Sequence, residues 1–253
     1  MVCCLKAFQS RACGSEEYKT RWLIFSVIII ILLAVPGDAL TAGSDRIVEV
    51  TRFESMNVGQ GVPAGWKMER FYGTPRLEVK RHGKGFCLHL FSDEESFFGI
   101  KRKIEVRLRD YPLLNWCWKV SKLPRNGDIR RADRDDQAVQ IYVAFSPAGF
   151  PARWNTPVVG YIWDNEAPAG WTGRSPQAGF GNVRYVVVRN KKDHLNRWYC
   201  EKRNLHDDFN KLFGGADDGT MKRAVEGIAV FINSQHTRTH AESEICDIYF
   251  SRD

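Results

Sequence analysis

The chain has 253 residues, of which 43% are hydrophobic and 12% aromatic, and its net charge is +7. This hydrophobic content supports a sizeable core and excludes a disordered, low-complexity protein. Basic and acidic residues are interspersed, as at Arg130, Arg131 and Asp133, whereas nucleic-acid binders usually concentrate positive charge on one face. We therefore expect no nucleic-acid partner.

An apolar run lies close to the start of the chain. It extends from Trp22 to Val35 and follows Lys19 and Arg21. As a helix it would be about 21 Å long, which is short for a bilayer core of roughly 30 Å. Small residues around Ala39 suit cleavage after that position. The run is therefore predicted to be a signal-peptide core, with a retained membrane anchor as the alternative.

Both alternatives divide the chain in the same way. Residues 1–42 form the signal peptide or membrane anchor, and residues 43–253 form one exported domain. We expect this domain in the periplasm or outside the cell. It would be either free or held at the inner membrane through residues 22–35.

The exported part contains an even number of cysteines, all within strand-like apolar runs. In an exported chain they could form two disulfides with three possible connectivities. The sequence favours buried free thiols instead, because cysteine is a common small core residue. The four are Cys87, Cys117, Cys200 and Cys246.

Short runs rich in Val, Ile, Tyr, Phe and Trp, separated by Gly, Pro, Asn and Asp, predict an all-β domain. In the run Gln137–Phe145, Val139, Ile141, Val143 and Phe145 share one face, which should be the core face. The predicted strands are 47–53, 65–71, 76–81, 86–91, 98–108, 114–120, 137–145, 158–164, 183–189, 196–203, 227–233 and 244–250.

One short helix is predicted at 205–213, with Asn204 as its N-cap and Gly214 as its terminator. Many strands with one helix indicate a two-sheet antiparallel β-sandwich, similar to jelly rolls and carbohydrate-binding modules.

Two connections, 146–157 and 165–182, are longer than a simple turn requires, and loops of that length are often functional. They carry the indoles Trp154 and Trp171 together with basic side chains. Sugar rings stack on such faces while polar groups bind the hydroxyls. The alternative is that these loops only pack on the sandwich. The candidate ligand-binding residues here are Arg153, Trp154, Trp171 and Arg174, and Trp163 in the intervening strand is included, although core packing is its alternative.

Asp135 and Asp136 precede a predicted central strand. Such carboxylates bind Ca²⁺ or act as general acid and base, but they also cap loops or pair with nearby arginines. Neighbouring strand residues point to opposite faces, so one of the two at most can face a given site. Both remain candidate ligand-binding residues, and no catalytic pair is predicted.

A second polar group contains His236, His240, Glu242 and Glu244. In an extended segment the two histidines would lie roughly 13 Å apart, too far to chelate one ion. We expect no metal and no cofactor. The chain also lacks a Gly-x-Ser-x-Gly nucleophile elbow and a phosphate-binding glycine loop.

Several stretches, taken in order, resemble the bacterial domain of unknown function family 3047. The resemblance covers most of the chain after about residue 53 and implies an exported β-sandwich, with no established activity. One departure is the turn Asn233-Ser234-Gln235-His236-Thr237, where an acidic turn would be expected. The matching stretches are 62–66, 114–120 with 123–124, 135–139, 161–163, Trp198 with Glu201, 203–204, 207–209, 213–214 and 247–250.

These observations predict a protein that binds a glycan or another envelope ligand and is more consistent with a binding module than with an enzyme. A polysaccharide lyase or hydrolase, using Asp135 or Asp136 with a histidine and an arginine, is the first alternative. A non-catalytic envelope assembly protein is the second.

Overall fold

The computed structural model describes residues 46–51, 53, 58–59, 61–83, 85–177, 182–214 and 224–253. The predicted signal peptide or anchor lies outside these ranges. Within them, no helix has the length and apolar character needed to cross a membrane.

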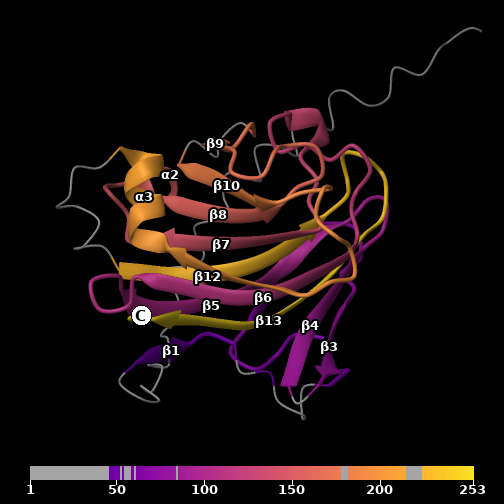
Figure 1. Ribbon diagram of the computed structural model, residues 1–253. Coiled ribbons are helices and arrows are strands. Elements are labelled where there is room, and N and C mark those ends of the chain that lie inside the picture. The colour runs from indigo at the N-terminus through magenta and orange to yellow at the C-terminus, as the bar shows by residue number, and fades with distance from the viewer. Residues whose placement is uncertain are drawn as a thin grey trace, which may run out of the picture.

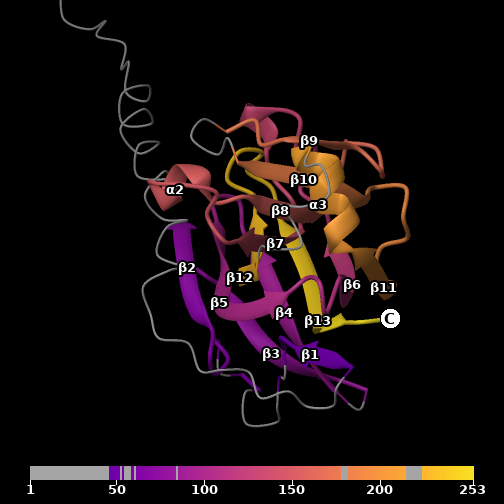
Figure 2. The same cartoon turned by 90° about the vertical axis from the view of Figure 1, so that its left-hand side faces the viewer.

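The predicted β-sandwich is confirmed: two sheets pack face to face around one core (Figures 1 and 2). The first, which we call sheet A, has the order β11-β6-β13-β4-β3, with β1 paired to β13. Its strands are β1 (Ile47–Glu49), β3 (Leu77–His82), β4 (Gly85–Ser92), β6 (Leu113–Lys122), β11 (Tyr199–Asn204) and β13 (Ala241–Ser251).

The second sheet, sheet B, has the order β2-β5-β12-β7-β8-β10-β9. Its strands are β2 (Lys67–Tyr72), β5 (Phe97–Arg107), β7 (Val139–Phe145), β8 (Val158–Trp163), β9 (Thr172–Arg174), β10 (Val183–Arg189) and β12 (Ala224–Asn233). The short strand β9, the helix α2 (Ala152–Asn155) and a 3-10 turn at Ala132–Arg134 were not predicted.

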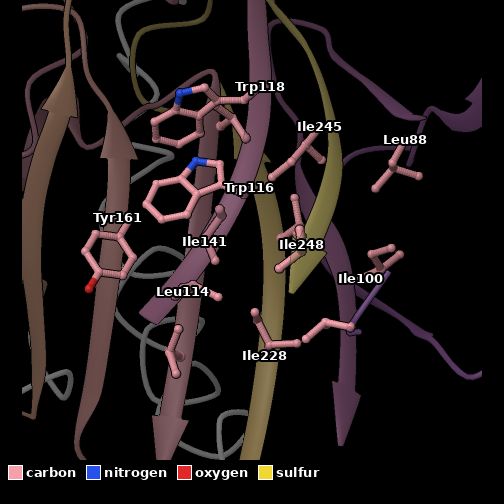
Figure 3. Packing of buried hydrophobic residues seen from close by; sticks show 14 of the residues in the cluster. Leu88, Ile100, Leu114, Trp116, Trp118, Ile141, Tyr161, Ile228, Ile245 and Ile248 are labelled. Carbon is pink, nitrogen blue, oxygen red and sulfur yellow. The ribbon is translucent and has the colours of Figure 1, made fainter. Parts of the chain in front are cut away.

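Aromatic rings from both sheets meet in the core. Trp116 and Trp118 of β6 lie beside each other, and the ring of Trp116 is 5.1 Å from that of Tyr161 in sheet B (Figure 3). In β7 the odd-numbered residues from Val139 to Phe145 have no exposed surface. The period-two prediction of the core face is therefore confirmed.

One pair within sheet B, β8 with β10, is parallel rather than antiparallel. Parallel neighbours need a crossover connection of about a dozen residues or more. The loop 165–182 is that connection, and β9 within it pairs antiparallel with β10. The length of this loop therefore has a structural cause.

Helix α3 (Leu205–Phe213) has the predicted bounds. The Asn204 side chain accepts a hydrogen bond from the Asp207 amide, and Gly214 has the left-handed conformation, with φ of 68°. Phe209 packs on Phe145 with ring centroids 4.6 Å apart, so the helix covers one end of the sandwich (Figure 1).

The four cysteines form the disulfides Cys87–Cys246 and Cys117–Cys200, both within sheet A. The favoured prediction of free thiols is thus wrong, and one of the three possible connectivities is selected. Because disulfides persist in oxidising compartments, the pair indicates an extracytoplasmic location.

Candidate functional site

The two aromatic loops meet at one place, because the parallel crossover returns the second loop to the start of β8. Val158 donates a backbone hydrogen bond to Asn182. The side-chain amide of Asn182 in turn donates a hydrogen bond to the backbone carbonyl of Trp154. The loops flank β8 at opposite ends in sequence, yet residue 182 lies beside residue 154.

The predicted loop residues differ in environment. Trp154 lies on α2 and is 44% exposed, and Arg174 is exposed on β9. Trp171 is partly buried against a second apolar cluster on the outer face of sheet B, with its ring over Gly173. The Arg153 side chain lies outside the described part of the chain.

Trp163 is fully buried, and its ring lies between those of Trp118 and Tyr199. It therefore faces the core and does not reach the outer face of sheet B.

The side chains of Asp135 and Asp136 have different hydrogen-bond partners. Asp136 has no exposed surface, and its carboxylate accepts backbone hydrogen bonds from His236 at 3.2 Å and Thr237 at 2.5 Å. It also accepts one from the Asn233 amide at 3.3 Å. Asp136 thus holds the turn that follows β12, about a hundred residues away. This is a structural role, but it differs from the local loop cap and the arginine pair that the sequence suggested.

Asp135 begins a chain of polar side chains that runs along the outer face of sheet B. Its carboxylate accepts hydrogen bonds from the amides of Gln177 at 3.0 Å and Gln137 at 3.2 Å. The Gln140 amide donates to Gln137 at 2.6 Å. Tyr142 donates its hydroxyl to Gln140.

Burial raises the pKa of Asp135 to about 6, although hydrogen bonds from Gln177 and Gln137 and the nearby His236 oppose it. The unfolded carboxyl titrates near 3.8. A raised folded-state pKa means that its stabilisation is complete below pH 3.8 and is lost as the pH rises through 6.

We therefore expect Asp135→Asn to remove part of the pH dependence of stability. Between pH 4 and pH 7.5, the unfolding free energy of the wild type should fall by about 2 kcal/mol relative to the variant. Urea unfolding at both pH values measures this difference. The exposed Asp133→Asn, on the same loop, should show no such change. Parallel pH curves for the wild type and Asp135→Asn would disprove the assignment.

The outer face of sheet B carries a row of aromatic rings that lie over small residues. Tyr142 and Tyr185 flank Gly160, where an added Cβ would lie 3.0 Å and 2.6 Å from their rings. Phe231 lies over Gly99 in the same way. Tyr142 and Phe231 are 5.4 Å apart by centroid, and Tyr142 and Tyr185 6.0 Å.

A hollow opens among these rings. We call the hollow, together with the rings of Phe71, Phe97, Tyr142, Tyr185 and Phe231, the aromatic trough. Phe71 and Phe97 close one side, stacked at 4.4 Å between centroids. Phe71, Phe97 and Tyr142 are partly exposed, while Phe231 and Tyr185 are buried. The hollow itself is lined by Glu69, Phe71, Lys101, Tyr142, Ala144, Val158, Gly227, Ile228, Ala229 and Phe231.

The charged groups of the trough neutralise each other. Lys101 and Glu69 form an ion pair, and both side chains are largely buried. The hydroxyls of Tyr142 and Tyr185 are 3.2 Å apart, and burial raises the pKa of both, so both stay protonated at neutral pH. The trough thus offers ring faces with little net charge, and its tyrosine hydroxyls are bonded to Gln140 and to each other.

The histidines and glutamates of the second polar group have separate partners. Glu242 accepts from His89 at 2.8 Å, and Glu244 pairs with Lys119 at 2.7 Å. His236 contacts Asp136 at 3.4 Å. Burial lowers the pKa of His236, but the hydrogen bond and charge of Asp136 outweigh it and raise that pKa. Among the described residues, no three His, Cys, Asp or Glu side chains are placed to hold a metal ion.

The sequence carried one sign of the trough. The even positions of β7, Gln140, Tyr142 and Ala144, lie on the face opposite the main core, where Tyr142 packs against the second apolar cluster. The ring partners of Tyr142, namely Tyr185 and Phe231, come from strands remote in sequence. Only the strand order therefore reveals the row of aromatic rings.

A family model described as "Protein of unknown function (DUF3047)" matches residues 64–249. No curated protein matches the chain.

Solved structures with a similar fold include three proteins in complex with sugars. A family 11 carbohydrate-binding module from Clostridium thermocellum, in complex with a beta-1,3-1,4-mixed-linked tetrasaccharide, has a TM-score of 0.44 and 7% identity, covering 83% of this chain and 97% of that one. TmCBM61 in complex with beta-1,4-galactotriose has a TM-score of 0.35 and 13% identity, covering 81% and 100%. The xyloglucanase domain of NopAA from Sinorhizobium fredii, in complex with cellobiose, has a TM-score of 0.40 and 9% identity, covering 75% and 93%. At this level the similarity concerns the sandwich alone.

Proposed function

The chain belongs to the DUF3047 family, and from the geometry of its own surface we propose that it binds a neutral glycan in the aromatic trough. The observation that carries the proposal is the partly exposed Tyr142 ring, which lies over Gly160 beside an open hollow. A glycine leaves room for a ring to lie close to the sheet, and a sugar ring packs on such a face through its C–H groups.

The charge pattern supports a neutral ligand. Lys101 is already paired with Glu69 inside the trough. An acidic polysaccharide could use the charge of Lys101 only by separating it from Glu69, and breaking a largely buried pair is costly. The hydroxyls of Tyr142 and Tyr185 are bonded to Gln140 and to each other and stay neutral, so they add no charge to the trough.

The candidates from the sequence are proposed to act around the trough. Asp135 lies at the end of the polar chain that reaches Tyr142 through Gln137 and Gln140. Trp171 packs on the same outer face, against the cluster that Tyr142 also contacts. Trp154 and Arg174, on the adjoining loops, are proposed as contacts for the outer units of a longer glycan.

The test is a binding screen of the protein against neutral β-glucans, galactans and xylans, with polygalacturonate and alginate as acidic counterparts. We expect at least one neutral polysaccharide to bind, and Tyr142→Ala to weaken it about tenfold or more, since stacking pairs contribute roughly 1 kcal/mol beyond area burial. Trp154→Ala, which removes an exposed indole outside the trough, should have a smaller effect. Absence of any neutral ligand, or equal binding by wild type and Tyr142→Ala, would refute the proposal.

A hydrolase or lyase is the second candidate, and Asp135 favours it. With its pKa raised to about 6, this carboxyl can hold a proton near neutral pH and donate it. Appearance of new reducing ends or unsaturated products in the binding mixtures, abolished by Asp135→Asn, would support an enzyme. Ligand recovered intact would leave binding as the function.

We propose that this binding takes place in the periplasm or outside the cell. The two disulfides support an oxidising location, and residues 22–35 would serve as signal peptide or anchor. Mass spectrometry of the N-terminus of the exported protein tests this choice: a start near residue 40 indicates cleavage, and the complete chain indicates an anchor. Recovery of the protein only in the cytoplasm would contradict both.

A further inference from the structure

The four cysteines lie in one row across four consecutive strands of sheet A, in the strand order β11-β6-β13-β4. Cys200 is opposite Cys117, and Cys117 is in turn opposite Cys246 in the register of β6 with β13. Cys246 is bonded to Cys87, with Cα atoms 4.5 Å apart. Each central cysteine therefore has a cysteine on both sides.

All four side chains point to the same face of the sheet. Their neighbours Trp118, Ile245 and Leu88 are buried in the core, and successive strand residues alternate between faces. Residues opposite each other in antiparallel strands have Cα atoms about 4.5–5.5 Å apart. That range falls within the span of a disulfide. Cys117 and Cys246 thus stand where a third, alternative disulfide could form.

The solvent exposure of the cysteines decreases along the row from Cys200 to Cys87. Cys200 is exposed and lies on β11, the edge strand of sheet A, and Cys117 is partly exposed. Cys246 and Cys87 are only 5% and 2% exposed. An external thiol can therefore reach the first disulfide far more readily than the second, and access is one of the factors that set exchange rates.

We propose that the row is a site of thiol–disulfide exchange with an external dithiol, entered at Cys200 and continued through Cys117. The external thiolate attacks Sγ of Cys200, forming a mixed disulfide and releasing the Cys117 thiolate. That thiolate attacks Sγ of Cys246, forming Cys117–Cys246 and releasing the Cys87 thiolate, which takes up a proton.

The second thiol of the external dithiol then resolves the mixed disulfide. It forms a disulfide within the reductant and leaves Cys200 as a thiol. Two electrons have moved from the dithiol to the protein, which keeps one disulfide and gains two thiols. The product differs from simple reduction, because the thiols are at the two ends of the row and the disulfide joins its centre.

The experiment treats the full-length folded chain with dithiothreitol, quenches with acid, alkylates the free thiols and maps each cysteine by mass spectrometry. The three cysteines outside the described residues are removed from the exchange by Cys3→Ser, Cys4→Ser and Cys13→Ser. We expect the first two-thiol product to be labelled at Cys87 and Cys200 and to contain Cys117–Cys246. Labelling at Cys117 and Cys200, with Cys87–Cys246 intact, would overturn the proposal.

Two variants separate the relay from direct reduction. Cys117→Ser removes the relay thiol, so release of the Cys87 thiol should become at least tenfold slower than in the parent. Cys200→Ser leaves Cys117 as a permanent thiol, so Cys117–Cys246 and free Cys87 should form without any reductant. Circular dichroism checks that each variant is folded. If Cys117→Ser does not fold, the result for Cys200→Ser alone decides the question. A Cys87–Cys246 disulfide that remains unchanged in Cys200→Ser would refute the relay.

Discussion

Replacing Trp118 with alanine should lower the free energy of unfolding by about 3–5 kcal/mol, the usual cost of removing a large buried aromatic side chain. Trp118 has no exposed surface, and its ring contacts those of Trp116 and Trp163 at 5.2 and 5.8 Å. Its indole also donates to Glu201 at 3.1 Å. The substitution therefore leaves a cavity where the two sheets meet.

Denaturant unfolding of the folded, oxidised protein measures this loss. Trp154→Ala is the matched control, because it removes the same side chain from a site that is 44% exposed, and we expect it to cost about 0.5 kcal/mol or less. A loss below about 1 kcal/mol for Trp118→Ala would show that the core is not organised around these rings.

The second large effect concerns Gly160→Ala, which should disturb the trough without removing any ring. The added methyl group would lie 2.6 Å from the ring of Tyr185 and 3.0 Å from that of Tyr142, so both rings must move. We expect glycan binding to weaken about tenfold or more, which corresponds to about 1.4 kcal/mol. Overpacking of this kind should cost roughly 1–3 kcal/mol of stability.

Gly149→Ala is the control for Gly160→Ala. Its new Cβ would come no closer than 3.8 Å to Asn155, an ordinary contact, and the residue lies on an exposed loop. Titration calorimetry with the ligand from the screen should show unchanged affinity for Gly149→Ala. Equal affinities for both alanine variants would mean that the positions of the Tyr142 and Tyr185 rings do not matter.

The local parts of the fold could be predicted because their causes are local. Helix 205–213 depends on the Asn204 cap and the Gly214 terminator, both within one turn of its ends. The core face of β7 follows from alternation within seven residues. Asp135 and Asp136 do have separate surroundings, as predicted, but they precede β7 and Asp135 is not extended, so strand alternation is not the cause.

The strand order could not be predicted, and it creates the features that matter here. Gly99, Tyr142 and Phe231 are remote in sequence, yet β12 pairs with both β5 and β7 and brings them together. The turn that Asp136 holds is likewise about a hundred residues away. The parallel pairing of β8 with β10 explains why the loop 165–182 is long. From the sequence alone, the length of this loop indicated a functional role.

The disulfide pairing has the same origin. Spacing along the chain leaves three connectivities open, and only the register of β4, β6, β11 and β13 selects Cys87–Cys246 and Cys117–Cys200. The same register places Cys117 opposite Cys246, which is the basis of the exchange relay.

The most direct measurement of the central claim is hydroxyl-radical footprinting of the protein with and without saturating neutral glycan. If the aromatic trough is the binding surface, oxidation of Tyr142 and Phe71 should fall severalfold on binding, while oxidation of the exposed Leu195 stays the same. Bound glycan with unchanged oxidation of Tyr142 and Phe71 would place the binding surface elsewhere and contradict the account.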